Sequence, residues 1–139
     1  MNFRQNKDHK IYHGQGLVEF ALVVFLLMLL AFGVMDFARV FHSTVVITGA
    51  AREGARFVTR NPDDIPGGRT AAAAEAQNAG LQITTANVTI TCTDLNTNGF
   101  CDGGFPVIST VDYQFSTMMG NLFSASTFSI SRSAEMMVP

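Results

Sequence analysis

The longest apolar stretch of the chain runs from Leu17 to Met35, and Glu19 is its only ionisable residue. About 20 apolar residues are enough to cross the roughly 30 Å hydrocarbon layer of a bilayer as a helix. We therefore expect one transmembrane helix over residues 17–35. An acid beside an apolar span costs free energy and marks a functional candidate, so Glu19 is the first residue that needs an explanation.

The residues before this stretch are mainly basic, because Arg4, Lys7 and Lys10 are opposed by a single acid, Asp8. Positively charged flanks of a membrane span stay in the cytoplasm. The chain is therefore expected to cross the cytoplasmic membrane once. Its basic leader, residues 1–14, would lie inside the cell and its C-terminus outside.

A helical pattern continues beyond the span. Apolar and small residues recur at alternating spacings of four and three, which is typical of one helix face: Phe37, Phe41, Thr44, Thr48, Ala51, Ala55 and Val58. We expect a single helix over residues 15–60, on the order of 60 Å long at 1.5 Å per residue. Half of it would lie in lipid and half would stand above the membrane.

The pattern changes after Asn61. Prolines and glycines from Pro62 to Gly68 predict a loop, and the alanine-rich stretch Thr70 to Asn78 predicts a short helix capped by Thr70 and ended by Gly80. From residue 81 onward, β-branched and alternating residues predict strands, over 88–91, 107–115 and 128–134.

The expected fold class is therefore α+β. A long N-terminal transmembrane helix would be followed by a loop and short helix over 61–80, and by a small antiparallel β domain over 81–139. One apolar face of the sheet would lie on the upper half of the long helix.

Composition excludes several classes of function. The formal net charge is −2 and no lysine follows Lys10, so no basic surface for nucleic acid is expected. We find no nucleophile motif, phosphate-binding loop or zinc spacing, and therefore expect no enzyme. The chain has only two cysteines, Cys92 and Cys101, both on the expected outer side. They could form a disulfide that closes a short loop, or remain two reduced, small apolar residues.

The segment between the cysteines has two interpretations. Asp94, Asn96 and Asn98 are followed by Gly99, as in the first half of a calcium loop, and Asp102 falls at the ninth position. The twelfth position, where a bidentate acid is expected, is Phe105. The loop is therefore either a calcium site with these four residues as ligands, calcium being the one cofactor indicated, or an Asn/Asp/Gly-rich hairpin tip.

The upper half of the long helix combines small residues with charge. Gly49, Ala50, Ala51, Gly54 and Ala55 are small enough for another helix or a sheet to approach closely. Arg52, Arg56 and Arg60 recur every four residues, and Glu53 is placed to pair with Arg56. These arginines form either a solvated face or a contact with carboxylates of another subunit.

Three blocks, in order, resemble the TadE-like family of pilin-like proteins of tight-adherence (Tad/Flp) pilus systems. They cover residues 14–22, 33–39 and 50–56, with the sequences GQGLVEFAL, GVMDFAR and AAREGAR. The resemblance implies cleavage by a prepilin peptidase after Gly14, so that Gln15 becomes the first mature residue. Other pilin subunits are the implied partners, and the acidic and basic residues of the blocks are the candidates for assembly: Glu19, Asp36, Arg39, Arg52, Glu53 and Arg56.

Glu19 becomes the fifth mature residue in this comparison. Its carboxylate could pair with the new α-amino group of a neighbouring subunit, so that neither charge faces lipid alone. Alternatively, it could reach toward the headgroups near the helix N-terminus, where an acid is also favourable.

Three classes of function remain. The chain could be a structural subunit that is processed and then enters an extracellular filament supporting adhesion. It could instead be a permanently anchored binding module, or an accessory protein of pilus assembly that stays in the membrane.

Overall fold

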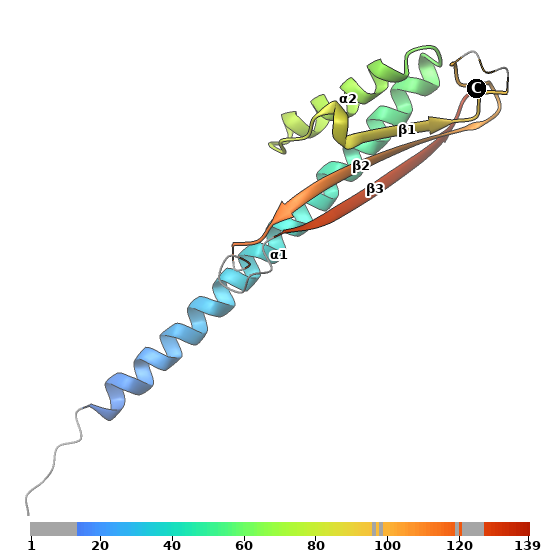
Figure 1. Ribbon diagram of the computed structural model, residues 1–139. Coiled ribbons are helices and arrows are strands. Elements are labelled where there is room, and N and C mark those ends of the chain that lie inside the picture. The colour runs from blue at the N-terminus through green and yellow to red at the C-terminus, as the bar shows by residue number, and fades with distance from the viewer. Residues whose placement is uncertain (1–13, 96, 98, 119, 121–126) are drawn as a thin grey trace, which may run out of the picture.

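The long helix and a small α+β head make up the fold seen in the computed structural model, which describes residues 14–95, 97, 99–118, 120 and 127–139. The elements are α1 (Gln15–Arg60), α2 (Ile65–Asn78), a short 3-10 turn (Thr85–Asn87), β1 (Val88–Cys92), β2 (Pro106–Ser116) and β3 (Thr127–Met137). α2 and the sheet gather around the upper half of α1, while the lower half extends away from them (Figure 1). The predicted α+β class is confirmed.

The lower half of α1 has no buried residue. Every residue from Gly14 to Met35 is exposed, and the most apolar 18-residue window of the helix has a mean hydropathy of 2.8 with none of it buried inside the protein. By length and composition, this helix is able to cross a membrane. We call this half, residues 15–35, the shaft.

The buried face of α1 begins at Asp36 and overlaps the predicted stripe at Ala51, Ala55 and Val58. Its residues are Asp36, Ser43, Ile47, Ala50, Ala51, Gly54, Ala55 and Val58. Phe37 and Phe41, which began the predicted stripe, are 73% and 65% exposed. The head packs where the helix has small side chains because bulky phenylalanines would hold its elements away from the α1 backbone.

α2 starts five residues earlier than predicted, at Ile65. Asp64 caps it by accepting a hydrogen bond from the Gly67 N–H at 2.7 Å, and Thr70 instead donates to the Pro66 carbonyl. The loop prediction was therefore wrong from Ile65 to Gly68. Proline is tolerated in the first helical turn because the N–H it lacks has no partner within the helix there.

The end of α2 follows the prediction. Gly80 has a φ of +88°, its N–H donates to the Gln77 carbonyl, and the Leu81 N–H donates to the Ala76 carbonyl. This pair of bonds is a Schellman motif, which needs the left-handed residue that glycine supplies without strain.

The three strands form an antiparallel sheet in the order β1-β2-β3. Val88 lies opposite Val111, and Phe115 lies opposite Phe128. Side chains alternate between the two faces of a strand, and the buried face of β2 carries Val107, Ser109, Val111 and Phe115. This face joins Ile47, Val58 and the alanines of both helices in one core. The β2–β3 hairpin runs down along α1 toward the shaft (Figure 1).

Candidate functional site

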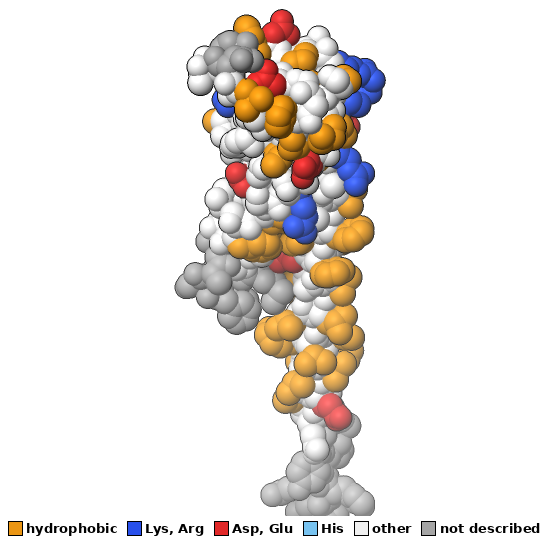
Figure 2. All heavy atoms as spheres, turned by 90° about the vertical axis from the view of Figure 1, so that its right-hand side faces the viewer, with side chains coloured by type: hydrophobic (Ala, Val, Ile, Leu, Met, Phe, Trp, Pro, Cys, Tyr) orange, Lys and Arg blue, Asp and Glu red, His pale blue; other side chains and the backbone are white. Residues whose placement is uncertain are grey.

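The shaft is the most distinctive surface of the protein. Hydrophobic side chains gather along the face of the shaft that Figure 2 shows, and most large hydrophobic residues from Leu17 to Met35 are well exposed. Between Glu19 and Asp36 it has no charged residue, a stretch of about 25 Å at 1.5 Å per residue. In water, such a surface would expose apolar area well beyond what a soluble protein carries. This surface fits a membrane-spanning helix by length and composition.

The predicted cleavage site coincides with the start of the helix. Gly14 is the N-cap and Gln15 the first residue of α1, whereas residues 1–13 lie outside the described part of the chain. Gly14, Gln15, Val18, Glu19 and Leu22 line one shallow hollow. Glu19 therefore shares a helix face with Gln15, and removal of the leader would place a new amino group on that face.

Asp36 and Arg39 lie together where the shaft meets the head. Asp36 is one of the few buried polar residues, with 9% of its surface exposed. Its Oδ1 accepts hydrogen bonds from the Met118 N–H at 3.1 Å and from Arg39 Nη1 at 3.4 Å. The Arg39 guanidinium carbon lies 5.1 Å from the centre of the Phe115 ring. We call these four residues the junction; it fastens the end of β2 to α1.

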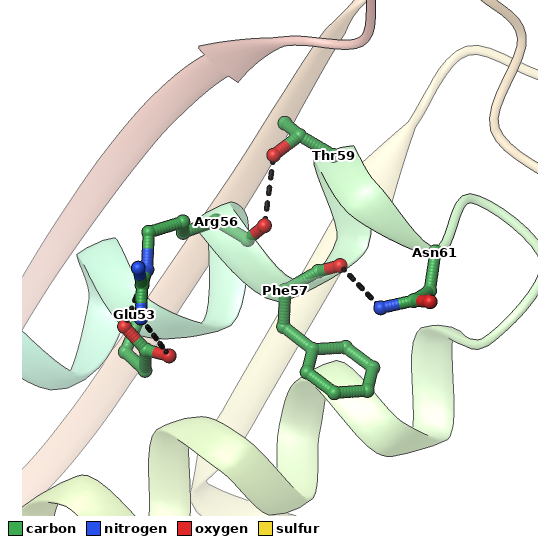
Figure 3. Close-up of polar contacts among 5 residues, drawn as sticks. All are labelled: Glu53, Arg56, Phe57, Thr59 and Asn61. Atoms are coloured by element: carbon green, nitrogen blue, oxygen red, sulfur yellow. Dashed lines mark hydrogen bonds and ion pairs between the residues drawn. The ribbon is translucent and has the colours of Figure 1, made fainter.

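The charged ridge on the upper part of α1 has an internal pair. Arg56 Nε and Nη2 each donate to a carboxylate oxygen of Glu53 at 2.8 Å (Figure 3). This hydrogen bonding lowers the pKa of Glu53. Because the folded-state pKa is depressed, the stabilisation is present above the ordinary carboxyl pKa and is lost as pH falls through the lowered value. An exposed pair of this kind contributes little to stability. Arg52 and Arg60 are exposed on the same helix.

The small residues of α1 serve packing within the chain. A Cβ on Gly54 would lie 2.7 Å from Ser109 Oγ and 3.0 Å from the Ala72 Cβ, and a Cβ on Gly68 would collide with Val58 Cγ2. The small residues of α1 therefore allow α2 and the sheet of the same chain to pack closely against the helix. Gly49 differs, since a Cβ there would meet nothing within 4 Å.

Ser109 lies at the centre of this packing and gives a testable prediction. It is fully buried, and its hydroxyl has no hydrogen-bond partner among the described residues. A buried polar group without a partner costs about 1–3 kcal/mol. Ser109→Ala should therefore leave the thermal midpoint of the head unchanged or raise it, whereas the control Ser129→Ala, at an exposed β3 position, should have no effect. A marked fall for Ser109→Ala would show that the hydroxyl is satisfied.

Cys92 and Cys101 form a disulfide that closes the loop after β1. This loop lies at the end of the head away from the shaft (Figure 1). Closing a loop of this length stabilises a fold by about 2–3 kcal/mol in the chain-entropy model. A Cys92→Ser, Cys101→Ser double variant should unfold at a lower temperature in oxidising buffer. A reducing agent should lower the midpoint of the wild type but not of the variant, and equal midpoints for the two proteins in oxidising buffer would contradict a stabilising disulfide.

The structure describes part of the predicted calcium loop. Asn96 and Asn98 lie outside the described residues. Asp94 accepts a hydrogen bond from the Gly99 N–H, and Asp102 accepts one from the Leu95 N–H. Within the described part of the chain no cluster of three or more histidine, cysteine or acidic residues could hold a metal. These bonds favour the hairpin tip, and calcium binding stays a prediction.

Sequence reasoning missed Phe115 and Met118 as partners of Asp36 and Arg39. Alternation along β2 marks Phe115 as inward-facing, but the contact joins residues 82 positions apart in the chain. No local pattern indicates which level of α1 the end of β2 reaches.

A free apolar shaft that begins at a Gly-Gln pair and carries a small α+β head fits a protein anchored in a membrane by one N-terminal helix. The family model of TadE-like proteins matches residues 14–56. The resemblance drawn from the sequence is confirmed over these residues, which make up most of α1. No match was found among curated proteins or among solved structures. The matched segment covers the shaft, the Asp36–Arg39 half of the junction and Gly54.

Proposed function

We propose that this protein is a pilin-like structural subunit of a Tad-type surface filament. Prepilin peptidase would cut it after Gly14, and the subunit would enter the filament through α1. The observation that carries this proposal is the shaft, which begins at the cleavage position, has no buried residue of its own chain and bears a single acid. The head covers only the upper half of α1, which leaves the shaft for lipid before assembly and for other helices afterwards.

Glu19 and Gln15 are the residues that would align the α1 helices of neighbouring subunits along the filament. Cleavage converts the Gln15 nitrogen into an α-amino group, which is mostly protonated at neutral pH. Such a cation among apolar helices needs a partner. Glu19 of the adjacent subunit supplies it, and the pair forms at one axial offset between neighbouring helices. Glu19 shares a face with Gln15, so each subunit presents both members of the pair on one side.

The topology follows from the same features. The basic leader stays in the cytoplasm and the head lies outside, where a disulfide persists. In a filament, the disulfide-closed loop at the far end of the head would then be available for adhesion.

A second candidate is an anchored accessory or binding module that never polymerises. The observation in its favour is that the family match ends at residue 56, so the head, including the disulfide-closed loop, is not part of the matched segment. In this alternative the head carries the function, calcium binding included, and the shaft serves only as an anchor.

Processing separates the first proposal from a merely anchored module. The test expresses the full chain with a prepilin peptidase in a Tad-competent host and determines the intact mass. The wild type should begin at Gln15 and Gly14→Leu should stay uncut. Gly16→Ala is the control and should be cut. A Cβ at either glycine meets nothing within 4 Å, so a difference between the two variants would reflect the peptidase and not the fold. A wild-type chain that remains uncut while the host's own pilin is processed would contradict the proposal.

A further inference from the structure

We propose that the junction end of the head is seated in the lipid headgroup layer of the bilayer that the shaft spans. The inference rests on the membrane anchoring in the proposed function, and on neither cleavage nor polymerisation. The partner proposed for this end of the head is lipid. The surface that would contact it consists of exposed apolar side chains at the level of Asp36.

Asp36 sets the level of this surface. It directly follows the apolar stretch 17–35, which is about 28 Å long as a helix and so matches the roughly 30 Å hydrocarbon layer. The headgroup region adds about 5–7 Å on each side. Asp36 therefore falls at the boundary between hydrocarbon and headgroups, and Phe41 lies about 7.5 Å further along the axis.

The hydrogen bond from the Met118 N–H to Asp36, at 3.1 Å, brings the chain beyond β2 to the same level. β3 starts there too, since the rings of Phe115 and Phe128 are 5.3 Å apart and Phe115 also lies against Arg39. Three separate segments of the chain thus meet the boundary at one height.

Each of these segments exposes a large apolar side chain at that height. Phe37 is mostly exposed, Met118 is 55% exposed and Phe128 is 43% exposed, and Phe41 lies exposed at the outer edge of the headgroup region. Phe37 directly continues the exposed apolar surface of the shaft on α1. Arg39 adds a half-exposed guanidinium beside these side chains. An apolar stem with a charged end at this depth is typical of side chains that reach phosphates at a membrane interface.

The alternative occupant is a second subunit, and the arrangement favours lipid. The exposed apolar side chains come from three segments that lie at one level along the axis of α1. Contact with the flat surface of a bilayer requires such an arrangement. Asp36 and Arg39 satisfy each other in part at the boundary, which lowers the cost of charge so close to the hydrocarbon. Seating of the head would fix its orientation on the membrane, and the subunit would have to leave this contact on entering a filament.

The chain has no tryptophan, so single-tryptophan variants report directly on lipid contact. The full-length protein is reconstituted at a high ratio of lipid to protein in phosphatidylcholine vesicles, with or without bromine atoms near the headgroup end of the acyl chains. Met118→Trp is the test position and Phe32→Trp, in the shaft, is the positive control. Leu95→Trp, at the far loop and 66% exposed, is the matched exposed control.

Brominated lipid should quench Met118→Trp to an extent comparable with Phe32→Trp, and should leave Leu95→Trp unchanged. Asp36→Ala in the Met118→Trp background removes the acceptor of the Met118 N–H bond and should reduce the quenching. If Phe32→Trp is quenched and Met118→Trp is not, the seating proposal is overturned while the anchoring stands. If Phe32→Trp is not quenched either, the membrane span in the proposed function fails, and the seating fails with it. Quenching of Met118→Trp that appears only at high protein density would assign the surface to a second subunit and overturn the lipid contact.

Discussion

Replacing Gly68 by alanine is expected to destabilise the head strongly, although it adds a single methyl group. The new Cβ would collide with Val58 Cγ2 and lie 3.0 Å from Ile90 Cδ1. Val58 is β-branched and cannot easily rotate within a helix. α2 would therefore have to move away from both α1 and β1. Overpacking of this kind costs about 1–3 kcal/mol, a large share of the 5–15 kcal/mol typical of a small domain.

Gly49→Ala is the matched control for this prediction. It lies on α1, and its Cβ would meet nothing within 4 Å. Replacing a helical glycine by alanine in open space should stabilise the helix by about 0.8–1 kcal/mol. Thermal unfolding of the full chain in detergent should therefore give a lower midpoint for Gly68→Ala and an equal or higher one for Gly49→Ala. Equal midpoints for the two variants would mean that α2 does not cross α1 as closely as described.

Glu19→Ala is expected to leave membrane insertion intact and to abolish filament incorporation. Insertion depends on the apolar stretch, which the substitution extends. Incorporation depends on a partner for the buried α-amino group, and leaving one member of such a pair without its partner costs about 3–5 kcal/mol. Because each 1.4 kcal/mol is a factor of ten, the amount of subunit in sheared filaments should fall by about a hundredfold or more.

Immunoblots of the membrane and sheared fractions measure this effect. Glu53→Ala is the control, because that acid pairs within its own chain with Arg56 and its loss should leave incorporation intact. A normal amount of the Glu19→Ala subunit in sheared filaments would contradict the proposed pairing of Glu19 with the α-amino group. Loss of both variants from the membrane fraction would instead indicate that an acid on α1 is needed for insertion or folding.

The sequence pattern predicted those helices and strands whose residue periodicity is contained within the element itself. Nineteen residues with one charge predict a free apolar helix, and alternation along residues 107–115 predicts the central strand. The helical stripe predicted along α1 has the right period, and Ala51, Ala55 and Val58 in it are buried, but Phe37 and Phe41 are exposed. Pro66 and Gly67 are common in loops, so pattern alone does not predict the early start of α2, where the Asp64 cap makes them part of the first turn.

In the candidate site too, only the contacts between residues close in sequence could be predicted. Gly14, Gln15 and Glu19 lie close in sequence, and their shared face follows from helix geometry alone. The junction could not be foreseen, because Asp36 and Met118 meet only through the length of the β2–β3 hairpin. Asp36 and Arg39 were assigned to contacts between subunits, and the structure adds a contact within the chain that neither residue's sequence neighbours indicate.

The central claim is that this chain is processed and polymerised through α1. The most direct measurement is the intact mass of the protein in the membrane fraction and in the sheared surface fraction of its native host. A processed and polymerised subunit should begin at Gln15 in the sheared filaments, and a membrane pool of the same species should accompany it. A Gln15 chain confined to the membrane, or an uncut chain beginning at Met1 there and nowhere else, would contradict the claim.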